Sequence, residues 1–126
     1  MEKIKQYRII SKKLIAELGN RKNQASHGLK YQVINDDGIG NYLLLRNGWK
    51  GSSRFYGIIV HIEVTDKGKV WLHQDNTDLI IADMLLERGV SESDLVLGFH
   101  PPAMREETGM APFLPLLASS PTATAE

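Results

Sequence analysis

The chain has 126 residues, its 15 basic and 15 acidic side chains give a formal net charge of zero, and it contains no cysteine. This length fits one domain with a buried core, and the missing cysteines exclude disulfides, thiolate metal sites and cysteine catalysis. A zero net charge argues against a protein that binds nucleic acid mainly by neutralising phosphates. The sequence shows no membrane-spanning apolar run and no signal-peptide core, so we expect a soluble, cytoplasmic protein without membrane contact.

Residues 2–19 have the pattern of an amphipathic helix. Apolar side chains recur at intervals of three and four residues, which places them on one side of a helix. They are Ile4, Tyr7, Ile10, Leu14, Ile15 and Leu18. Gly19 and Asn20 are typical of a helix end, so we expect the helix to stop there and the polar residues 21–28 to form a linker.

The other side of this predicted helix is basic. Arg8, Lys12 and Lys13 lie on it, with Ile9 among them. These three basic residues are candidates for contact with nucleic acid, and an apolar residue in a basic stripe can mark a protein contact. The alternative is a solvated helix face with one exposed isoleucine, which is common on protein surfaces.

A first hairpin follows the helix. Residues 29–35 alternate between apolar and polar side chains, residues 36–40 are rich in Asp and Gly, and residues 41–46 form the returning strand. We expect residues 47–49 to end this hairpin and residues 50–54 to form a flexible polar loop.

The strongest hairpin signal in the sequence lies between Phe55 and Asp75. Side chains alternate along its first strand, so one set of them is predicted to face the core. This set is Tyr56, Ile58, Val60, Ile62 and Val64. Residues 66–68 form a three-residue loop in which Gly68 can take the left-handed conformation.

The register of this hairpin is predicted to place two histidines side by side. With Thr65 opposite Lys69, the apolar face pairs Val64 with Val70, Ile62 with Leu72, and Val60 with Gln74. The opposite face then pairs Glu63 with Trp71, His61 with His73, and Ile59 with Asp75. A slip of one residue would turn the apolar face to solvent, so burial sets this register.

After this hairpin the sequence changes to a helical period. Asn76 or Thr77 can cap a helix, and Asp78 places negative charge in its first turn, where the helix dipole favours it. The apolar side chains of residues 79–86 provide a buried face. Residues 95–99 are predicted to form a short strand that rejoins the sheet.

This order of elements predicts an α+β fold with an N-terminal helix, a mostly antiparallel meander sheet of four or five strands, and a second helix packed on the sheet. We assign this domain to residues 1–111. Residues 112–126 are rich in Pro, Ala, Ser and Thr, so we expect a disordered C-terminal tail.

Five motifs occur in a fixed order along the chain. They are LLRNGW at 44–49, VHIEV at 60–64, KVWLHQD at 69–75, GV at 89–90 and DLVLGFHPP at 94–102. Together they resemble the XisI family, the fdxN element excision controlling factor proteins, which are found mainly in cyanobacteria. The resemblance covers about residues 2–111, and its most specific piece is VLGFHPP.

The resemblance implies a role in programmed excision of a DNA element, in a complex with a XisH-type partner that resembles an endonuclease-like fold. It supplies no catalytic residues, so we expect a non-enzymatic accessory protein without a cofactor. Because the chain has no net charge, we expect the partner to make most of the DNA contact. Residues 103–104 and the tail from Pro112 depart from the family pattern. The sequence leaves the oligomeric state open, and a homo-oligomer is one of the alternatives.

The candidates for binding the partner are aromatic, proline and histidine-face residues, because rigid apolar surface is enriched in protein interfaces. They are Trp49, Phe55, His61, Glu63, Trp71, His73, Phe99, His100, Pro101 and Pro102. The alternative is that the tryptophans simply cover the core.

The histidine-bearing face also supports an enzyme as an alternative. The side chains of His61 and His73, with Glu63 and Asp75, suit zinc or iron, and a bound metal would assist hydrolysis. Cross-strand neighbours on a flat sheet rarely converge on one point, so His100 would be needed as a further ligand. The sequence contains no nucleophile elbow or phosphate-binding loop, so we expect no metal site and no catalytic residue. A DNA-binding module that uses the basic helix is the third class.

Overall fold

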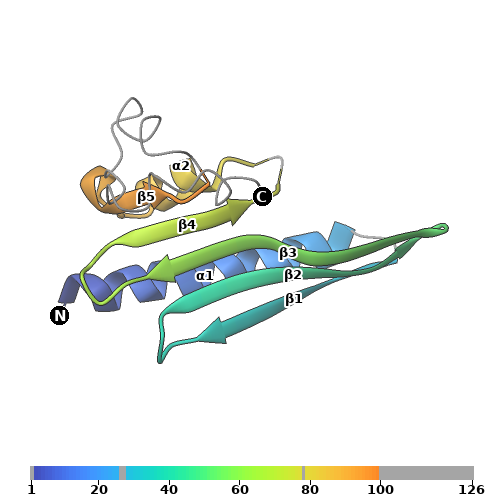
Figure 1. Cartoon of the computed structure of the whole chain (residues 1–126), viewed down its shortest axis with the longest axis horizontal. Helices are drawn as coiled ribbons and strands as arrows, with labels where there is room; N and C mark the ends of the chain where they lie inside the picture. Colours follow the sequence, from blue (N-terminus) through green and yellow to red (C-terminus); the bar gives the residue numbers. More distant parts are fainter. Residues whose placement is uncertain (1, 26–27, 78, 100–126) are drawn as a thin grey trace, which may run out of the picture.

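The structure is a computed structural model that describes residues 2–25, 28–77 and 79–99. The elements are α1 (Glu2–Ala25), β1 (Leu29–Asp36), β2 (Asn41–Lys50), β3 (Ser53–Val64), β4 (Val70–Asp75), α2 (Ile81–Glu87), the 3-10 helix η1 (Glu92–Asp94) and β5 (Leu95–Leu97). The strands lie in the order β1-β2-β3-β4-β5, antiparallel except for β5, which runs parallel to β4. The predicted α+β class, with its meander sheet and two helices, is confirmed (Figure 1).

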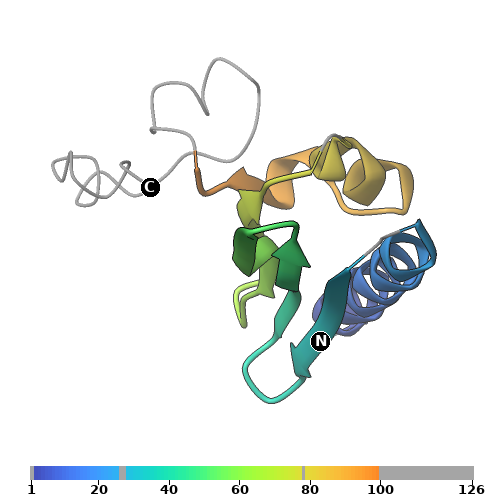
Figure 2. The ribbon, with the colours of Figure 1, turned by 90° about the vertical axis from the view of Figure 1, so that its right-hand side faces the viewer.

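Both helices lie on one face of the sheet. Figure 2 shows α1 along this face and α2 beside it, and side chains from both helices and from four strands form one core. Its fully buried members include Leu14 and Leu18 of α1, Tyr42 of β2, Leu72 of β4 and Leu85 of α2. No described helix covers the opposite face, and none is long and apolar enough to cross a membrane.

The first helix is longer than predicted. It continues to Ala25, so the predicted stop at Gly19 and Asn20 is wrong, and so is the predicted linker over residues 21–25. Gly19 is buried, and a Cβ atom there would lie 2.9 Å from Val33 Cγ2 and 3.2 Å from Leu44 Cδ1. This glycine therefore permits close contact between helix and sheet instead of ending the helix.

The additional helical turn pairs with the edge strand β1. The side chain of Asn23 donates from Nδ2 to the carbonyl oxygen of Tyr31 and accepts from its backbone N–H through Oδ1, each over 2.8 Å. An amide side chain makes here the two hydrogen bonds that a neighbouring strand would make. This contact covers part of an edge that is otherwise open to pairing with another chain.

The hairpin of β2 and β3 is also longer than predicted. The two strands remain paired as far as Lys50 and Ser53, so the predicted end at residues 47–49 and the loop at 50–54 are wrong. Gly51 and Ser52 form the turn, and Gly51 has the left-handed φ of 64° that a tight hairpin turn requires. The paired strands β2 and β3 extend beyond the end of α1 (Figure 1).

A β-bulge interrupts the pairing of β2 with β3. Leu44 pairs with Val60, whereas Leu45 pairs with Ile58, so Ile59 is the additional residue on β3. In the part of β3 that precedes Ile59, the side chains therefore face the opposite side of the sheet from the one predicted, because one added residue exchanges the two faces of a strand. Tyr56 and Ile58 were predicted to face the core, and this prediction is wrong: they are 66% and 38% exposed.

A second bulge interrupts the pairing of β3 with β4. The predicted pairs nearest the turn are confirmed: Val64 with Val70, Glu63 with Trp71, and Ile62 with Leu72. Beyond them His73 is the additional residue, so His61 pairs with Gln74 and Val60 pairs with Asp75. The predicted backbone pairs of His61 with His73, Val60 with Gln74 and Ile59 with Asp75 are therefore wrong.

The second bulge directs Asp75 toward the start of α2. Its carboxylate accepts hydrogen bonds from the backbone N–H of Ile81 over 3.0 Å and from the Thr77 hydroxyl over 2.6 Å. The Thr77 hydroxyl in turn accepts from the N–H of Leu79 over 3.1 Å. Asp75 thus satisfies a free amide at the helix start, a role predicted for Asn76 or Thr77, while Asp78 lies outside the described residues.

Candidate functional site: the open face of the sheet

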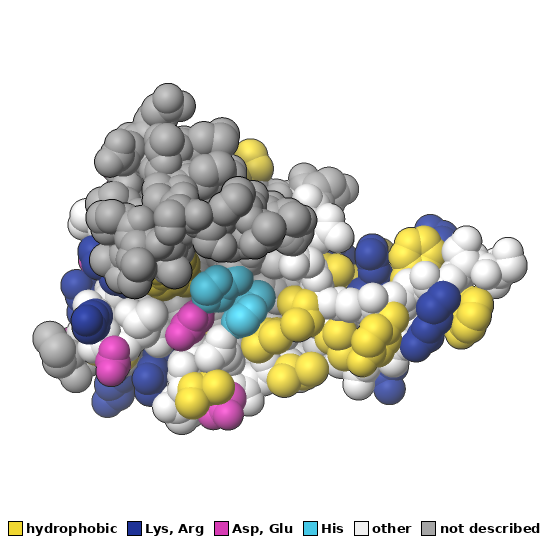
Figure 3. All heavy atoms as spheres, viewed as in Figure 1, with side chains coloured by type: hydrophobic (Ala, Val, Ile, Leu, Met, Phe, Trp, Pro, Cys, Tyr) yellow, Lys and Arg dark blue, Asp and Glu magenta, His cyan; other side chains and the backbone are white. Residues whose placement is uncertain are grey.

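The sheet face opposite α1, which we term the open face, carries five of the seven described residues that were predicted to bind a partner. Its apolar, aromatic and histidine members, with the charged members on the central strand, are Ile34 on β1, Leu43, Leu45 and Trp49 on β2, Arg54, Tyr56, Ile58, His61 and Glu63 on β3, and Trp71 and His73 on β4. The register also places Lys30, Gln32, Asp36, Asn41, Asn47 and Gln74 on this face. Cross-strand partners share a face, and at the centre of the sheet the neighbours of these residues along their strands, such as Leu44 and Leu72, are buried. Figure 3 shows this face, with hydrophobic side chains between the histidines and the basic side chains of the hairpin end.

The two histidines lie side by side at one end of the open face. The ring centroids of His61 and His73 are 4.7 Å apart, and the Trp71 ring stacks on His73 at 5.5 Å. The Nε2 atom of His73 donates to Glu63 Oε1 over 2.8 Å. The structure thus brings together four of the predicted residues, while Asp75 points away from them toward α2.

Hydrogen bonds indicate the tautomer of His61. Asn41 donates from Nδ2 to the carbonyl oxygen of Ile39 over 3.2 Å, which turns its Oδ1 toward His61. The Nε2–H group of His61 donates to that oxygen over 2.6 Å. Burial lowers the pKa of His61, and the neighbouring His73 lowers it further, whereas Glu63 acts in the opposite direction. The neutral ring of His61 therefore suits this site.

The described part of the chain contains no group of three or more His, Cys, Asp or Glu side chains placed to hold a metal ion. The Nε2 atoms of both histidines already hydrogen-bond, to Asn41 and Glu63. His100, the further ligand that a metal site was predicted to need, lies outside the described residues, as do Pro101, Pro102 and the predicted tail at 112–126.

The lowered pKa of His61 leads to a prediction about stability and pH. The unfolded chain takes up the proton near the ordinary pKa of 6.5, and the folded chain does so only at lower pH. The contribution of His61 to stability is therefore complete above pH 6.5 and is lost as pH falls toward the lowered pKa. We expect urea unfolding to show a larger loss between about pH 7.5 and pH 5.5 for the wild type than for His61→Gln.

An NMR titration of the His61 ring provides the direct measurement. A midpoint below 6.5 is expected, and a midpoint at or above 6.5 would contradict the lowered pKa. The part of the pH dependence that persists in His61→Gln belongs to other groups, so the variant serves as the reference for the unfolding curves.

The other end of the open face is an aromatic and basic hairpin. The guanidinium of Arg54 lies 5.6 Å from the Trp49 ring centroid and 5.3 Å from that of Tyr56. Trp49 is 56% exposed, so it does not cover the core. Phe55 lies on the helix side of the sheet, with the Arg46 guanidinium 5.0 Å from its ring centroid, and so does not join the open face.

Phe99 lies beside the histidine end of this face. It follows Gly98, whose backbone packs so closely on His73 that a Cβ atom there would lie 3.2 Å from Nδ1. The side chain of Phe99 is exposed. An exposed aromatic residue therefore directly follows the glycine that packs on His73.

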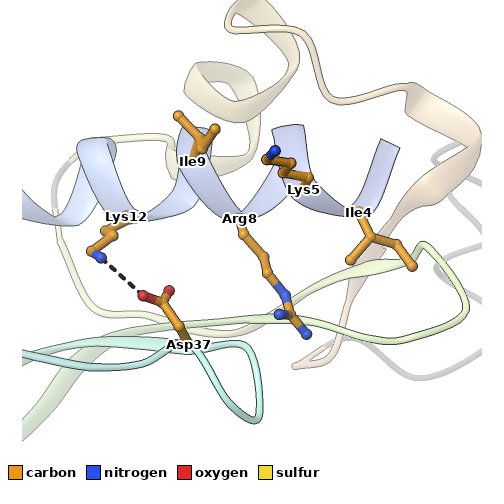
Figure 4. Close-up of a pocket in the computed structure, with 6 residues that line it drawn as sticks. All are labelled: Ile4, Lys5, Arg8, Ile9, Lys12 and Asp37. Atoms are coloured by element: carbon orange, nitrogen blue, oxygen red, sulfur yellow. Dashed lines mark hydrogen bonds and ion pairs between the residues drawn. The ribbon is translucent and has the colours of Figure 1, made fainter. Parts of the chain in front are cut away.

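The basic residues of α1 lie away from the open face. A pocket of about 360 Å³ is lined by Ile4, Lys5, Arg8, Ile9, Lys12 and Asp37, and Figure 4 shows Arg8 and Lys12 directed toward the turn after β1. Lys12 forms an ion pair with Asp37 over 2.9 Å, and Lys13 is not among the lining residues. Of the predicted nucleic-acid candidates, two thus line a pocket that also holds a carboxylate.

Sequence reasoning missed the apolar centre of the open face. Tyr56 and Ile58 were assigned to the core, and Arg54 to a loop. One signal was available, because an isolated glycine within a strand pattern indicates a bulge, and Gly57 lies two residues before Ile59.

The fold and the open face together define a class of protein: a small α+β domain in which two helices cover one side of a meander sheet and the other side presents aromatic, apolar and histidine side chains. The family model described as XisI protein matches residues 1–112, and the chain belongs to the XisI family. The predicted resemblance is thereby confirmed.

Two solved structures show the same fold. A XisI-like protein from Anabaena variabilis ATCC 29413 is 30% identical, with a TM-score of 0.78, and the match covers 87% of this chain and 99% of that chain. The fdxN element excision controlling factor XisI from the same organism is 32% identical, with a TM-score of 0.73, and the match covers 86% of this chain and 97% of that chain. No curated protein matches the chain.

Proposed function

We propose that this protein is an excision controlling factor of the XisI type, a non-enzymatic accessory protein that acts with a XisH-type partner in the programmed excision of a DNA element. The observation that carries the proposal is the family match over residues 1–112. The similar structure named fdxN element excision controlling factor XisI supports the same role.

The open face supports a role in binding a macromolecular partner. It combines exposed Trp49 and Tyr56 with Arg54, and Trp, Tyr and Arg are the residue types that contribute most to protein interfaces. At the other end, His61 and His73 are held in place by Asn41 and Glu63. Such a preorganised surface suits recognition, because little side-chain entropy is lost on binding.

The partner is proposed to make most of the contact with DNA. The chain has no net charge. The pocket beside α1, which is lined by Arg8 and Lys12, also contains Asp37, and the hydrogen bond from Lys12 lowers the pKa of the Asp37 carboxyl. An ionised carboxylate in this pocket opposes the approach of a phosphate group, so the basic residues of α1 would neutralise the DNA backbone only weakly.

Co-expression with a XisH-type protein tests the proposal. We expect a heteromeric complex on size exclusion and a dissociation constant below micromolar. Trp49→Ala should weaken binding by at least about tenfold, because interface tryptophans commonly contribute more than about 1.4 kcal/mol. Ile80→Ala, at an exposed position outside the open face, is the matched control. Absence of a complex at micromolar concentration would overturn the proposal.

The competing classes have distinct readouts. Stoichiometric zinc, manganese or iron that is lost in His61→Ala or His73→Ala would favour a metal-assisted hydrolase. A salt-sensitive shift of DNA by the isolated protein, weakened in Arg8→Ala and Lys12→Ala, would favour a DNA-binding module. Either result would contradict the proposed accessory role and favour the corresponding class instead.

A further inference from the structure

The open face has complementary charges at its two ends. On β3, Arg54 lies at the hairpin end and Glu63 at the histidine end, and both point to the same side of the sheet. Between them lie apolar side chains from three strands: Ile58 pairs with Leu45, and Ile34 pairs with Leu43. The polar side chains of Gln32 and Asn47 share this part of the face. Ile34 and Ile58 are exposed, and both leucines are partly so.

We propose that the open face pairs with the open face of a second copy of this chain in a two-fold symmetric, sheet-on-sheet dimer. Arg54 and Glu63 are nine residues apart, about 30 Å along a strand, and Ile58 lies near the midpoint. The two-fold axis lies between the two sheets and runs perpendicular to the strands at Ile58. It places each Arg54 over the Glu63 of the other copy. The two β3 strands then run antiparallel, with Ile58 against Ile58.

The charges discriminate between the two ways of stacking identical faces. A two-fold axis along the strands would place Arg54 over Arg54 and Glu63 over Glu63, and like charges directly opposite are destabilising. The axis across the strands forms two opposite-charge contacts instead. It also fits isologous association, in which the same patch on both copies is self-complementary.

The size of the face suits a stable dimer. Strands β1 to β4 contain 8, 10, 12 and 6 residues. At about 3.3 Å per residue and about 4.8 Å between strands they present roughly 570 Å² of flat area, and side-chain relief adds to this. Stable interfaces bury about 600–1,000 Å² on each partner. Packed sheets lie about 10 Å apart with interdigitated side chains, for which Leu43, Leu45 and Ile58 provide the middle layer.

The dimer concerns the protein by itself, whereas one consequence rests on the proposed function. If a XisH-type partner uses the same face, the second copy and the partner compete for it. The free protein would then be stored as a dimer that opens when the partner binds. A monomeric free protein would overturn the dimer and leave the heteromeric complex untouched, so the two proposals fail separately.

Sedimentation and light scattering of the full chain test the dimer. We expect a dimer at about 100 µM, and Ile58→Glu should shift it to monomer, because burying an unpaired carboxylate is costly. Ile80→Glu is the matched control, since Ile80 is 64% exposed and lies outside the open face. A monomeric wild type, or equal behaviour of the two variants, would overturn the proposal. A dimer that forms only after removal of residues 112–126 would assign the face to that segment instead.

Charge reversal tests the orientation of the two copies. Arg54→Glu and Glu63→Lys should each weaken the dimer about tenfold, since each places like charges opposite each other. A mixture of the two variants should form a heterodimer close to wild-type strength. In that heterodimer the carboxylate introduced at position 54 of one copy meets the amino group introduced at position 63 of the other, and the second contact keeps Arg54 against Glu63. A mixture no stronger than the single variants would overturn the proposed axis.

Discussion

Replacing Asp94 by alanine is expected to lower the free energy of unfolding by about 3 kcal/mol, as for the loss of a buried, hydrogen-bonded carboxylate. Asp94 is only 7% exposed and joins three parts of the chain. Its Oδ2 accepts from the hydroxyl of Tyr7 on α1 over 2.6 Å. The amino groups of Lys3 and Lys69 lie 3.3 Å and 3.6 Å from the carboxylate.

Asp94 also links stability to acid. Burial raises the pKa of its carboxyl, but the hydrogen bond from Tyr7 and the neighbouring Lys3 outweigh burial, so the pKa is lowered from 3.8. A lowered pKa in the folded state means that this contribution is present above pH 3.8 and is lost as pH falls through the folded value. Asp94→Ala should therefore unfold at lower urea concentration at neutral pH, with the difference from wild type shrinking in acid.

Two further variants test this assignment. Glu92→Ala removes an exposed carboxylate two residues away and should change stability by less than about 0.5 kcal/mol. Tyr7→Phe should cost about 1–2 kcal/mol, because it removes the hydrogen bond to Asp94 and the acceptor that the N–H of Ser91 uses over 3.1 Å. An Asp94→Ala variant as stable as Glu92→Ala would show that the carboxylate does not join these segments.

Alternation of side chains predicted the sheet correctly only near the turns. The pairs Val64–Val70 and Ile62–Leu72 follow from a short loop and an apolar face, which leave one register that buries the apolar side chains. Farther along, each strand gains one residue, Ile59 on β3 and His73 on β4. A pattern with a period of two carries no information on where an additional residue is inserted.

Packing explains both bulges. At the first, Ile59 and Val60 are consecutive and both buried, which a regular strand with one solvent face does not allow. At the second, Asp75 is turned to reach the amide of Ile81 at the start of α2. These contacts form only once helices and sheet are assembled, so the alternation of side chains does not specify them. Gly57 is a local signal for the first bulge alone.

Because the two bulges were not predicted, the sequence predicted only part of the candidate site. His61 and His73 remain adjacent although their backbones are not paired: their ring centroids are 4.7 Å apart. The apolar centre around Ile58 was missed, since it exists only because the first bulge exchanges the two faces of β3. Gly19 shows the same limit: a glycine late in a helix pattern fits either a stop or a close contact, and the contact with Val33 decides between them.

The second large effect on stability is expected from a substitution at one of two glycines in turns. Gly40→Ala should destabilise the protein by at least about 3 kcal/mol, whereas Gly51→Ala should destabilise it by only about 1 kcal/mol. The two glycines have nearly the same backbone conformation, with φ of 70° and 64°. Alanine at either position meets the same left-handed strain. They differ in space: a Cβ atom on Gly40 would lie 2.3 Å from the carbonyl oxygen of Val64, whereas Gly51 has nothing within 4 Å.

The backbone around Gly40 has little freedom to adjust. Its carbonyl oxygen accepts a hydrogen bond from the N–H of Val64 over 2.8 Å, so the turn after β1 is tied to the end of β3 at the atoms that the new methyl group would displace. Thermal unfolding of the two variants, measured side by side, isolates this steric cost because the strain in φ cancels. We expect Gly40→Ala to melt at least about 10 °C below Gly51→Ala. Equal melting temperatures would mean that the turn moves away from Val64 at no cost, and that this contact does not hold the first hairpin against the core.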